Sequence, residues 1–325
     1  MTRIAIVEGD GIGHEVIPVA RSVLELLHPE YDYFTVEIGY GMWERTGCPC
    51  ADKEIREMKD ADAILFGAIT TSPMKDYQSV VLRVRKALDL YANLRPVKDG
   101  GFDIMIVREN TEGLYSGIEE CSPDRATTLR VVTKTGTERI IRMAIRLARQ
   151  RRNLLTIGHK ANVLKSDVFF RDICIAEAKE AGISFNDKFI DALSLDVLLH
   201  PASYDVVVTT NIFGDILSDV ASYLVGGMGL VPSANIGERY ALFEPVHGSA
   251  PDIAGKNLAN PIAALRSAGM LLTHVGDIEG ENHIESAIRT VLAQGIKTRD
   301  LGGSAGTREF GEAVLRVLDQ SGRRA

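Results

Sequence analysis

Short apolar runs rich in β-branched residues alternate along this chain with longer stretches in which apolar residues recur every three or four positions. This alternation is typical of an α/β fold, in which helices pack against a largely parallel sheet. The short runs predict strands at residues 4–7, 61–66, 104–107, 129–133, 154–157 and 206–209. The periodic stretches predict helices at residues 15–27, 138–150 and 167–181, and residues 69–78 are predicted to form a loop.

Length and composition limit the class of protein further. The 325 residues are enough for roughly two domains with a substantial core, and no linker-like segment separates them. No apolar run approaches the roughly 18 residues of a membrane span, and a glycine loop stands where a signal peptide would have its apolar stretch. We therefore expect a cytoplasmic protein without a membrane partner.

Charge and cysteine content exclude two other classes. The formal charge of −7 argues against a nucleic-acid partner, and we interpret the local basic cluster Arg149–Arg152 as a solvated helix end. The cysteines are too few and too scattered for a disulfide framework. We predict free thiols at Cys48, Cys50, Cys121 and Cys174.

Three glycines, Gly9, Gly11 and Gly13, follow the first predicted strand and precede a helix. A dinucleotide-binding fingerprint would place its third glycine at position 16, where the sequence has Val16. The spacing therefore predicts a tight strand-to-helix turn and not a Rossmann pyrophosphate site. The second glycine-rich segment, residues 248–255, is the better candidate for binding a nucleotide.

Two aspartates follow the predicted strand 206–209. Asp215 and Asp219 are four residues apart, so both lie on one face of the helix expected at the carboxyl end of that strand. Like charges at this spacing cost a few tenths of a kcal/mol unless something neutralises them. A Mg²⁺ or Mn²⁺ ion held by both carboxylates would do so. The alternative is that Asp215 interacts with the helix dipole and that Asp219 is solvated.

Arginines form a second group of candidate residues. Arg85 and Arg95 flank the segment 89–94, and Arg108 ends a predicted strand. Because guanidinium groups bind carboxylates through paired hydrogen bonds, the three arginines predict a substrate with two or three carboxylates. A salt bridge to a neighbouring acid is the alternative for each of them.

Two further side chains are candidates for proton transfer. Lys160 follows the predicted strand 154–157, and a lysine among cations can have its pKa lowered enough to act as a base. Tyr115 lies seven residues after Arg108 and is a candidate proton donor.

Six motifs occur in order along the chain between residues 7 and 256: VEGDGIG at 7–13, DLYANLRP at 89–96, RENTEGLYSG at 108–117, HKAN at 159–162, NIFGDILSD at 211–219 and EPVHGSAPDIAGK at 244–256. Together they resemble the isocitrate, 3-isopropylmalate and homoisocitrate dehydrogenases, which are metal-dependent decarboxylating dehydrogenases. The resemblance implies a two-domain α/β fold with a large mixed sheet flanked by helices, and not a standard Rossmann fold. It implies a large cofactor-binding domain from residues 1–90 and 227–325. Residues 91–226 would form a small central domain with the substrate, metal and dimer interface.

The resemblance also implies roles for the matching residues. Tyr115 would protonate the carbon left by CO₂, and Lys160 would help to remove the hydroxyl proton. The implied substrate-binding residues are Ser79, Val81, Arg85, Arg95, Arg108 and Asn162. The implied ligands of Mg²⁺ or Mn²⁺ are Asp191, Asp215 and Asp219. In this family Lys160 and Asp191 are delivered to the site of the neighbouring subunit, so we expect a homo-oligomer, at least a dimer, with shared active sites.

The implied cofactor is NAD. Asp252 and Ile253 stand where NADP enzymes tend to carry a lysine and a tyrosine, and an acid there would accept ribose hydroxyls and repel a 2′-phosphate. The implied cofactor-binding residues are Thr70, Thr71, His247, Gly248, Ser249, Ala250, Asp252, Ile253 and Asn260.

The implied reaction is the NAD-dependent oxidative decarboxylation of a 3-substituted malate. Ser79 matches the serine with which isocitrate enzymes contact the distal carboxylate, whereas Val81 and Leu82 resemble an isopropyl pocket. The segment 112–120 resembles NAD-dependent isocitrate dehydrogenases more than it resembles bacterial isopropylmalate enzymes. We therefore favour isocitrate, which would yield 2-oxoglutarate and CO₂. The alternatives are 3-isopropylmalate, then homoisocitrate. A non-catalytic regulatory subunit is a further alternative, and the complete set of catalytic and metal residues argues against it.

Overall fold

A computed structural model describes residues 1–71, 77 and 79–322 of the chain. The strands are β1 (Arg3–Val7), β2 (Asp32–Thr35), β3 (Ala63–Phe66), β4 (Ala92–Asp99), β5 (Phe102–Glu109), β6 (Glu119–Cys121), β7 (Ala126–Thr128), β8 (Leu154–His159), β9 (Ser184–Phe189), β10 (Val206–Thr209), β11 (Pro232–Ile236) and β12 (Ala241–Pro245). The helices are α1 (Gly13–Leu27), α2 (Tyr40–Thr46), α3 (Asp52–Lys59), α4 (Val80–Ala87), α5 (Lys134–Arg149), α6 (Lys165–Glu180), α7 (Ile190–Leu199), α8 (Asn211–Ser222), α9 (Ile262–His274), α10 (Ile278–Ala293) and α11 (Thr307–Gly322).

The fold is a large mixed sheet flanked by helices, as predicted. Over the described part of the chain, ten strands hydrogen bond in the order β2-β1-β3-β12-β11-β4-β5-β10-β8-β9, and β6 and β7 form a separate two-stranded sheet. The chain divides into two compact units. The first unit comprises Met1–Leu88, Met228–Ala234 and Arg239–Ala325, and the second comprises Asp89–Gly227 and Asn235–Glu238.

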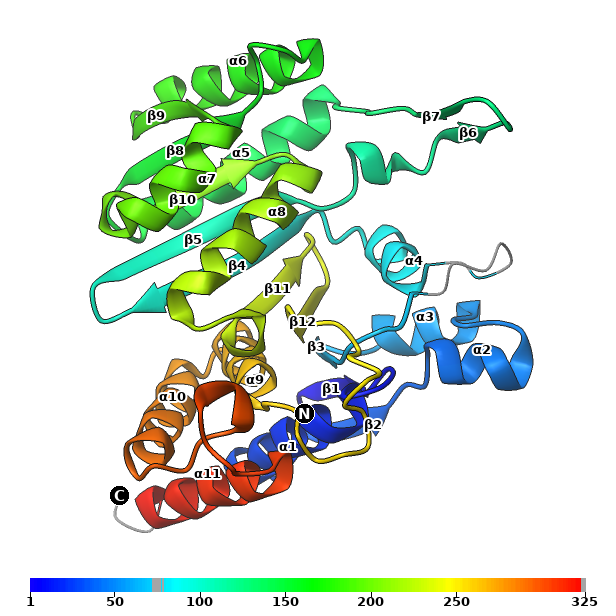
Figure 1. Ribbon diagram of the computed structural model, residues 1–325, viewed down its shortest axis with the longest axis vertical. Helices are drawn as coiled ribbons and strands as arrows, with labels where there is room; N and C mark the ends of the chain where they lie inside the picture. The colour runs from blue at the N-terminus through cyan, green and yellow to red at the C-terminus, as the bar shows by residue number, and fades with distance from the viewer. Residues whose placement is uncertain (72–76, 78, 323–325) are drawn as a thin grey trace. The chain divides into compact units, whose positions relative to one another are not determined.

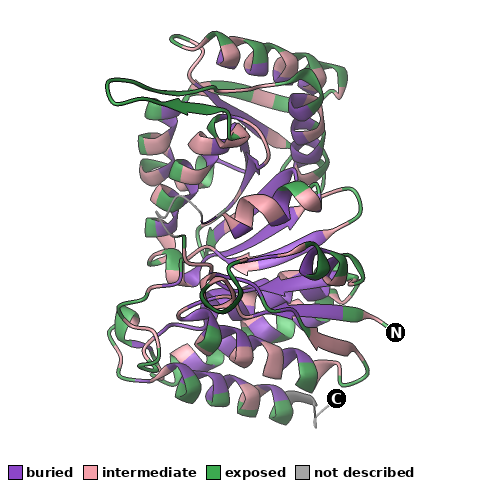
Figure 2. Cartoon of the chain, turned by 90° about the vertical axis from the view of Figure 1, so that its right-hand side faces the viewer, coloured by how far each residue is buried: buried purple, intermediate pink, exposed green. Residues whose placement is uncertain are grey.

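Both ends of the chain build the first unit. Its strand β1 pairs in parallel with β2 and β3, and β3 pairs in parallel with β12. Helix α1, near the N-terminus, packs against α9 and α11 near the C-terminus (Figure 1). Every residue of β3 is buried, and Figure 2 shows how the buried strands contrast with the exposed outer faces of the helices. The apolar run of β3 is therefore a strand of the core, covered on both faces.

The turn between β1 and α1 is tight, as its glycine spacing predicts. Gly9 and Gly11 have φ angles of 74° and 58°, in the left-handed region that favours glycine. A β-carbon at Gly9 would lie 2.1 Å from the carbonyl oxygen of Ala68, and one at Gly11 would lie 2.1 Å from that of Ser249. These glycines therefore serve the close packing of the turn against two other loops of the first unit.

The second unit brings three strand ends to one edge of its sheet. Strands β5, β10, β8 and β9 run in parallel, whereas β4 is antiparallel to β5, with Asn93 opposite Arg108. Thr209, the last residue of β10, is also paired with Arg108. The beginning of β4 therefore lies at the same edge as the carboxyl ends of β5 and β10, where open α/β sheets bind ligands.

An apolar cluster holds α7 and α8 against this sheet. It buries side chains from β4, β5, β10 and both helices, together with Tyr204. Its members are Val97, Ile104, Ile106, Ile190, Leu193, Val197, Tyr204, Val207, Leu217 and Ala221. The position of α8 at the sheet edge is consequently fixed by packing over its buried face.

One predicted strand is wrong, and one predicted loop is described only in part. Residues 129–133 are not a strand: Leu129 is 55% exposed, Val131 forms an isolated bridge to Gly113, and Thr133 caps α5. β-branched residues favour a strand where a neighbouring strand pairs with them, and among the described residues this segment has only the isolated bridge of Val131. The predicted loop at 69–78 includes residues 72–76 and 78, which lie outside the described residues.

The basic cluster after α5 is not simply solvated. Arg151 donates from Nε to Oδ1 of Asp205 at 2.8 Å, and the backbone N–H of Arg152 donates to Oδ2 at 2.9 Å. Asp205 is fully buried, so these contacts neutralise a carboxylate in the interior. Arg149 donates to the carbonyl oxygen of Ala181.

Among the described residues, no helix has the length and apolar character needed to cross a bilayer.

Candidate functional site

Helix α8 carries the two predicted acidic residues at the sheet edge of the second unit. It begins directly after β10, and its buried face includes Asn211, Gly214 and Ser218. Asp215 and Asp219 lie beside this buried face, with side chains 29% and 48% exposed. Both carboxylates are therefore open in part to a ligand.

Arginines neutralise the two carboxylates. Arg95 donates from Nη2 to Asp215 at 3.1 Å and from Nη1 to Asp219 at 3.2 Å. Arg108 also donates from Nη1 to Asp215. The sequence suggested a divalent cation as the source of this neutralisation, and in the single chain the guanidinium groups already provide it. They do so because the antiparallel β4 brings Arg95 to the same edge as Arg108.

Tyr115 belongs to the same cluster. It lies in a short 3₁₀ helix, Leu114–Ser116, and its hydroxyl donates to Oδ2 of Asp215 at 3.1 Å. The guanidinium of Arg108 lies 5.5 Å from the centre of the Tyr115 ring. The structure thus brings together Arg95, Arg108, Tyr115, Asp215 and Asp219 within the second unit.

Burial raises the pKa of Asp219, and the negative charge of Asp215 raises it further, while Arg95 and Arg108 oppose the shift. A carboxylate whose charged form is disfavoured in this way gains from any additional positive charge placed against it. Two carboxylates with oxygen ligands on one helical face also match the preference of Mg²⁺ and Mn²⁺ for hard oxygen ligands. The donor set therefore fits a divalent cation.

Several residues that hold this cluster were not assigned a role from the sequence. Asn93, Asn211 and Ser218 accept hydrogen bonds from Arg95 or Arg108. A β-carbon at Gly214 would lie 2.6 Å from Cβ of Arg108, so only glycine lets Arg108 cross the helix at this point. The presence of Asn211 and Gly214 inside the motif at 211–219 was the available signal.

Lys160 and Asp191 form a second cluster in the same unit. Lys160 follows β8, Asp191 lies in the first turn of α7, and Nζ of Lys160 is 2.7 Å from Oδ1 of Asp191. This contact lowers the pKa of Asp191. In the single chain Lys160 therefore faces an anion and not the other cations that the sequence suggested. Asn162, two residues further on, is exposed.

No group of three or more histidine, cysteine, aspartate or glutamate side chains within the described ranges is arranged to hold a metal ion. Asp191, the third predicted ligand, is instead paired with Lys160. A three-carboxylate site is thus not assembled by the described part of one chain alone.

The remaining predicted substrate-binding residues lie in the first unit. Ser79 caps α4 by accepting a hydrogen bond from the backbone N–H of Leu82 at 3.4 Å, and Val81 is partly buried in the first turn of that helix. Arg85 donates from Nη2 to Glu244 at 3.3 Å. Within the described residues its buried Nε has no hydrogen-bond partner.

The predicted cofactor residues also belong to the first unit. The hydroxyl of Thr70 donates to that of Ser249 at 2.8 Å, so two of them lie side by side. Burial lowers the pKa of His247, and its buried Nε2 has no hydrogen-bond partner among the described residues. Asn260 bonds to Asp300 at 2.9 Å. A buried ring nitrogen without a partner fits a segment that completes its hydrogen bonds with a ligand.

Most other predicted cofactor residues present themselves to solvent. Asp252, Thr71 and Gly248 are exposed, and Ile253 is partly exposed. Ala250 has a φ angle of 40°, a left-handed conformation that is uncommon for a residue with a side chain. The segment 247–260 thus presents an irregular backbone and open side chains, as a nucleotide-binding loop requires.

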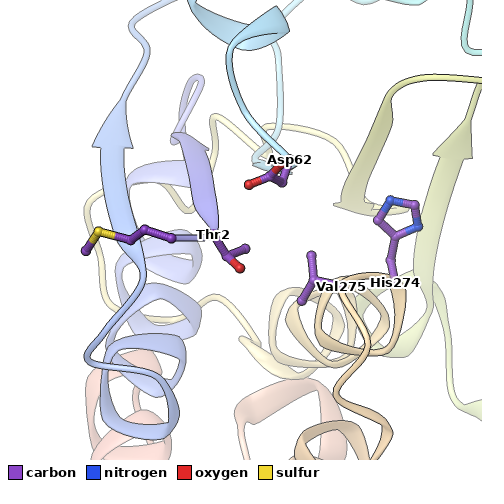
Figure 3. A pocket seen from close by; sticks show the side chains of 5 residues that line it. Thr2, Asp62, His274 and Val275 are labelled. Carbon is purple, nitrogen blue, oxygen red and sulfur yellow. The ribbon is translucent and has the colours of Figure 1, made fainter.

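A pocket of about 460 Å³ in the first unit lies elsewhere (Figure 3). Its lining residues are Met1, Thr2, Asp62, His274 and Val275. They precede β1 and β3 or end α9, at the amino ends of the parallel strands. None of them is a predicted site residue.

Known proteins match this chain over nearly its full length. The sequence model of the family described as isocitrate/isopropylmalate dehydrogenase matches residues 3–314. A 3-isopropylmalate/3-methylmalate dehydrogenase of Methanocaldococcus jannaschii is 45% identical, over 97% of this chain and 98% of its own length. An isocitrate/homoisocitrate dehydrogenase of Thermus thermophilus is also 45% identical, over 97% of this chain and 98% of its own length.

Solved structures show the same similarity. The crystal structure of isocitrate dehydrogenase from Methylococcus capsulatus superposes with a TM-score of 0.93 at 40% identity, over 98% of this chain and 99% of that chain. A β-decarboxylating dehydrogenase from Thermococcus kodakarensis gives a TM-score of 0.88 at 42% identity, over 98% of this chain and 97% of that one.

Proposed function

Because the chain belongs to the isocitrate/isopropylmalate dehydrogenase family, whose members decarboxylate 3-substituted malates, we propose that it catalyses the NAD-dependent oxidative decarboxylation of isocitrate to 2-oxoglutarate and CO₂. The observation that carries the proposal is the cluster of Arg95, Arg108, Tyr115 and Asp215. It combines fixed positive charge for carboxylates with acidic groups for a cation and a hydroxyl for proton transfer.

The arginines bind and orient the substrate. Each guanidinium offers paired N–H donors that match a carboxylate, and Arg95 and Arg108 are nearly fully buried, so their hydrogen bonds are little weakened by water. Arg85, on α4, is proposed to hold a further carboxylate. Asn162 contributes as a polar contact to the same substrate.

Asp215, Asp219 and the Asp191 of another subunit would hold Mg²⁺ or Mn²⁺, which when bound polarises the substrate's oxygen atoms as a Lewis acid. NAD, when bound along residues 247–260 with Thr70 and Thr71, would supply the acceptor for the hydride that leaves C2 of the substrate. The first unit is accordingly proposed to be the cofactor-binding domain, and the second to be the domain that holds substrate and metal.

Two residues of the chain move protons. Lys160 takes the proton of the C2 hydroxyl during oxidation. Tyr115 donates its hydroxyl proton to the carbon from which CO₂ has departed, and the neighbouring Arg108 stabilises the resulting phenolate. These roles require Lys160 to reach the substrate, whereas in the single chain it lies against Asp191.

We therefore propose a homo-oligomer in which Lys160 and Asp191 of one subunit complete the site of another. Leu195 and Leu199 on α7, the helix that carries Asp191, are 60% and 63% exposed, which is typical of a surface covered by a partner. Co-expression of Lys160→Ala and Asp215→Asn chains tests this sharing. Each variant alone should be inactive, and the mixed oligomer should regain activity because one of its sites is intact; no gain would refute a shared site.

The substrate is tested by comparing kcat/KM for isocitrate, 3-isopropylmalate and homoisocitrate with NAD and Mn²⁺. Ser79, with its hydroxyl at the start of α4, supports isocitrate, and Val81 beside it favours 3-isopropylmalate, which is the alternative. We expect the highest kcat/KM for isocitrate. A higher kcat/KM for 3-isopropylmalate or homoisocitrate would make that acid the proposed substrate instead. Absence of NADH formation with all three would favour a non-catalytic regulatory subunit.

A further inference from the structure

Each of the two arginines that contact Asp215 also donates a hydrogen bond from its Nε to an asparagine. Arg95 donates from Nε to Oδ1 of Asn93 at 2.8 Å. Arg108 donates to Oδ1 of Asn211 from Nε at 3.2 Å and from Nη2 at 2.8 Å. The side chains of both asparagines are enclosed, with exposures of 0% and 1%. Two arginines from different strands thus share one arrangement, although their asparagines come from a strand and a helix.

A second hydrogen bond fixes the orientation of each asparagine amide. The amide nitrogen of Asn93 donates to Oδ1 of Asn235 at 2.9 Å, and that of Asn211 donates to the carbonyl oxygen of Glu112 at 3.1 Å. Rotating either amide by half a turn would place its NH₂ against a guanidinium and its oxygen against another acceptor. The oxygen is therefore directed toward the arginine.

Arg85 provides an internal contrast. It lies in the first unit, its Nη2 contacts Glu244, and its buried Nε has no hydrogen-bond partner within the described part of the chain. Three arginines are assigned to substrate carboxylates, and only the two that also contact Asp215 have an asparagine at Nε. The asparagine contact thus accompanies the two arginines that lie at α8, the helix that carries the proposed metal ligands Asp215 and Asp219.

We propose that Asn93 and Asn211 are positioning residues that fix the guanidinium planes of Arg95 and Arg108. An arginine side chain has several rotatable bonds, and a bond at Nε removes rotation about its last one. The Nη groups are then directed at Asp215 before any substrate arrives, which lowers the cost of ordering them on binding. This inference rests on the proposed function, because it assigns the Nη groups to substrate carboxylates.

The variant Asn211→Ala tests the proposal. It should raise KM for the substrate, and the Kd measured by calorimetry with Mn²⁺ but without NAD, by roughly 10–100-fold, the range typical of residues that orient a binding group. KM for NAD should change little. In an Arg108→Lys background, which has no Nε for Asn211 to hold, the same substitution should change KM by less than about twofold, because the two effects act through one contact.

Thr156→Val is the matched control. Thr156 is buried in β8 of the same unit, and its hydroxyl has no hydrogen-bond partner among the described residues, so this variant should keep the wild-type KM. If Asn211→Ala fails to fold, Asn211→Ser, which is too short to reach the guanidinium, is measured by the same criteria. Asn93→Ala in wild-type and Arg95→Lys backgrounds provides the parallel cycle.

An unchanged substrate KM in Asn211→Ala, or equal fold-changes in the wild-type and Arg108→Lys backgrounds, would overturn the proposal. These outcomes are distinct from failure of the proposed function, which would appear as a wild-type protein that oxidises none of the three acids. The cycle is measured with whichever acid the wild-type protein prefers.

Discussion

The candidate substrate site in the second unit and the candidate cofactor loop in the first differ in the contacts that hold each of them in place. At Asp215, buried side chains bind other side chains, as in the contacts of Arg95 and Arg108. Along residues 247–260 most side chains are at least partly exposed. The backbone N–H of Gly255 donates to Glu15, and Nζ of Lys256 donates to the carbonyl oxygen of Asp252, so each of these contacts uses one main-chain group. The comparison teaches that charge is fixed rigidly where chemistry is proposed, whereas the nucleotide segment needs only shape and a few accessible groups.

This contrast predicts that a change at Asp215 affects catalysis and stability together. Asp215→Asn should lower metal-dependent kcat/KM by roughly a thousandfold, because several kcal/mol of charge stabilisation depend on this carboxylate. It should also destabilise the protein by about 1–3 kcal/mol, since Arg95 and Arg108 lose their shared counter-charge. Steady-state kinetics with Mn²⁺ and thermal unfolding measure both. Wild-type turnover in this variant would refute the metal assignment.

A change in the packing against Arg108 should also affect both catalysis and stability, but less strongly. Gly214→Ala places a β-carbon 2.6 Å from Cβ of Arg108, so the helix or the strand must shift. We expect a loss of about 1–3 kcal/mol of stability, as is usual for overpacking, together with a higher KM for the substrate. Gly248→Ala is the control in the cofactor loop, because no atom lies within 4 Å of an added β-carbon there. Equal destabilisation by both substitutions would remove the contrast.

The cofactor loop should respond in specificity alone. Asp252 is exposed, so Asp252→Lys should leave the free energy of unfolding within about 0.5 kcal/mol of the wild type. The ratio of kcat/KM for NAD to that for NADP should fall by roughly fivefold, since one exposed charge pair is worth about 1 kcal/mol. If the kinetics with both cofactors stay the same, residues 247–260 do not clamp the cofactor.

The smallest expected effect is a pH dependence of stability that arises at His28 in the first unit. Burial lowers the pKa of His28, but hydrogen bonds to Asp277 and Glu30 outweigh it, so the net pKa is raised. The stabilisation from this group is therefore complete below the unfolded value of about 6.5 and is lost as pH rises through the higher folded value. The free energy of unfolding should fall as pH rises above about 6.5, and His28→Gln should remove that slope. Thermal unfolding across this range measures it; an unchanged slope in the variant would assign the effect to another group.

The sequence was informative where one segment carried both the local structure and the chemistry. The strand at 206–209 and the helix after it were predicted, and the spacing of Asp215 and Asp219 placed both on one helical face. The failure of the glycine spacing at Val16 correctly indicated a tight turn. These inferences needed only the periods of a strand and a helix and the conformational freedom of glycine.

What the sequence did not reveal depends on pairing between distant segments. The antiparallel register that sets Asn93 opposite Arg108 cannot be read from either strand alone, so the sequence offered a salt bridge as an alternative for Arg95 without identifying Asp215 as its partner. The buried contact of Arg151 with Asp205, 54 residues apart, was missed for the same reason. The β-branched run at 129–133 looked like a strand, because propensity does not show whether a partner strand is available.

The double contact of Arg95 with Asp215 and Asp219 has a consequence for how ligands load. Arg95 and the two aspartates are counter-ions for one another, so a cation or a polycarboxylate that bound here would displace part of an internal ion pair. A cation that bound Asp215 would release guanidinium N–H groups for the acid, and an acid that bound those N–H groups would release Asp215 for the cation. Linkage then requires that either ligand raise the affinity for the other by an equal factor. Titrating Mn²⁺ with and without isocitrate would give that factor directly.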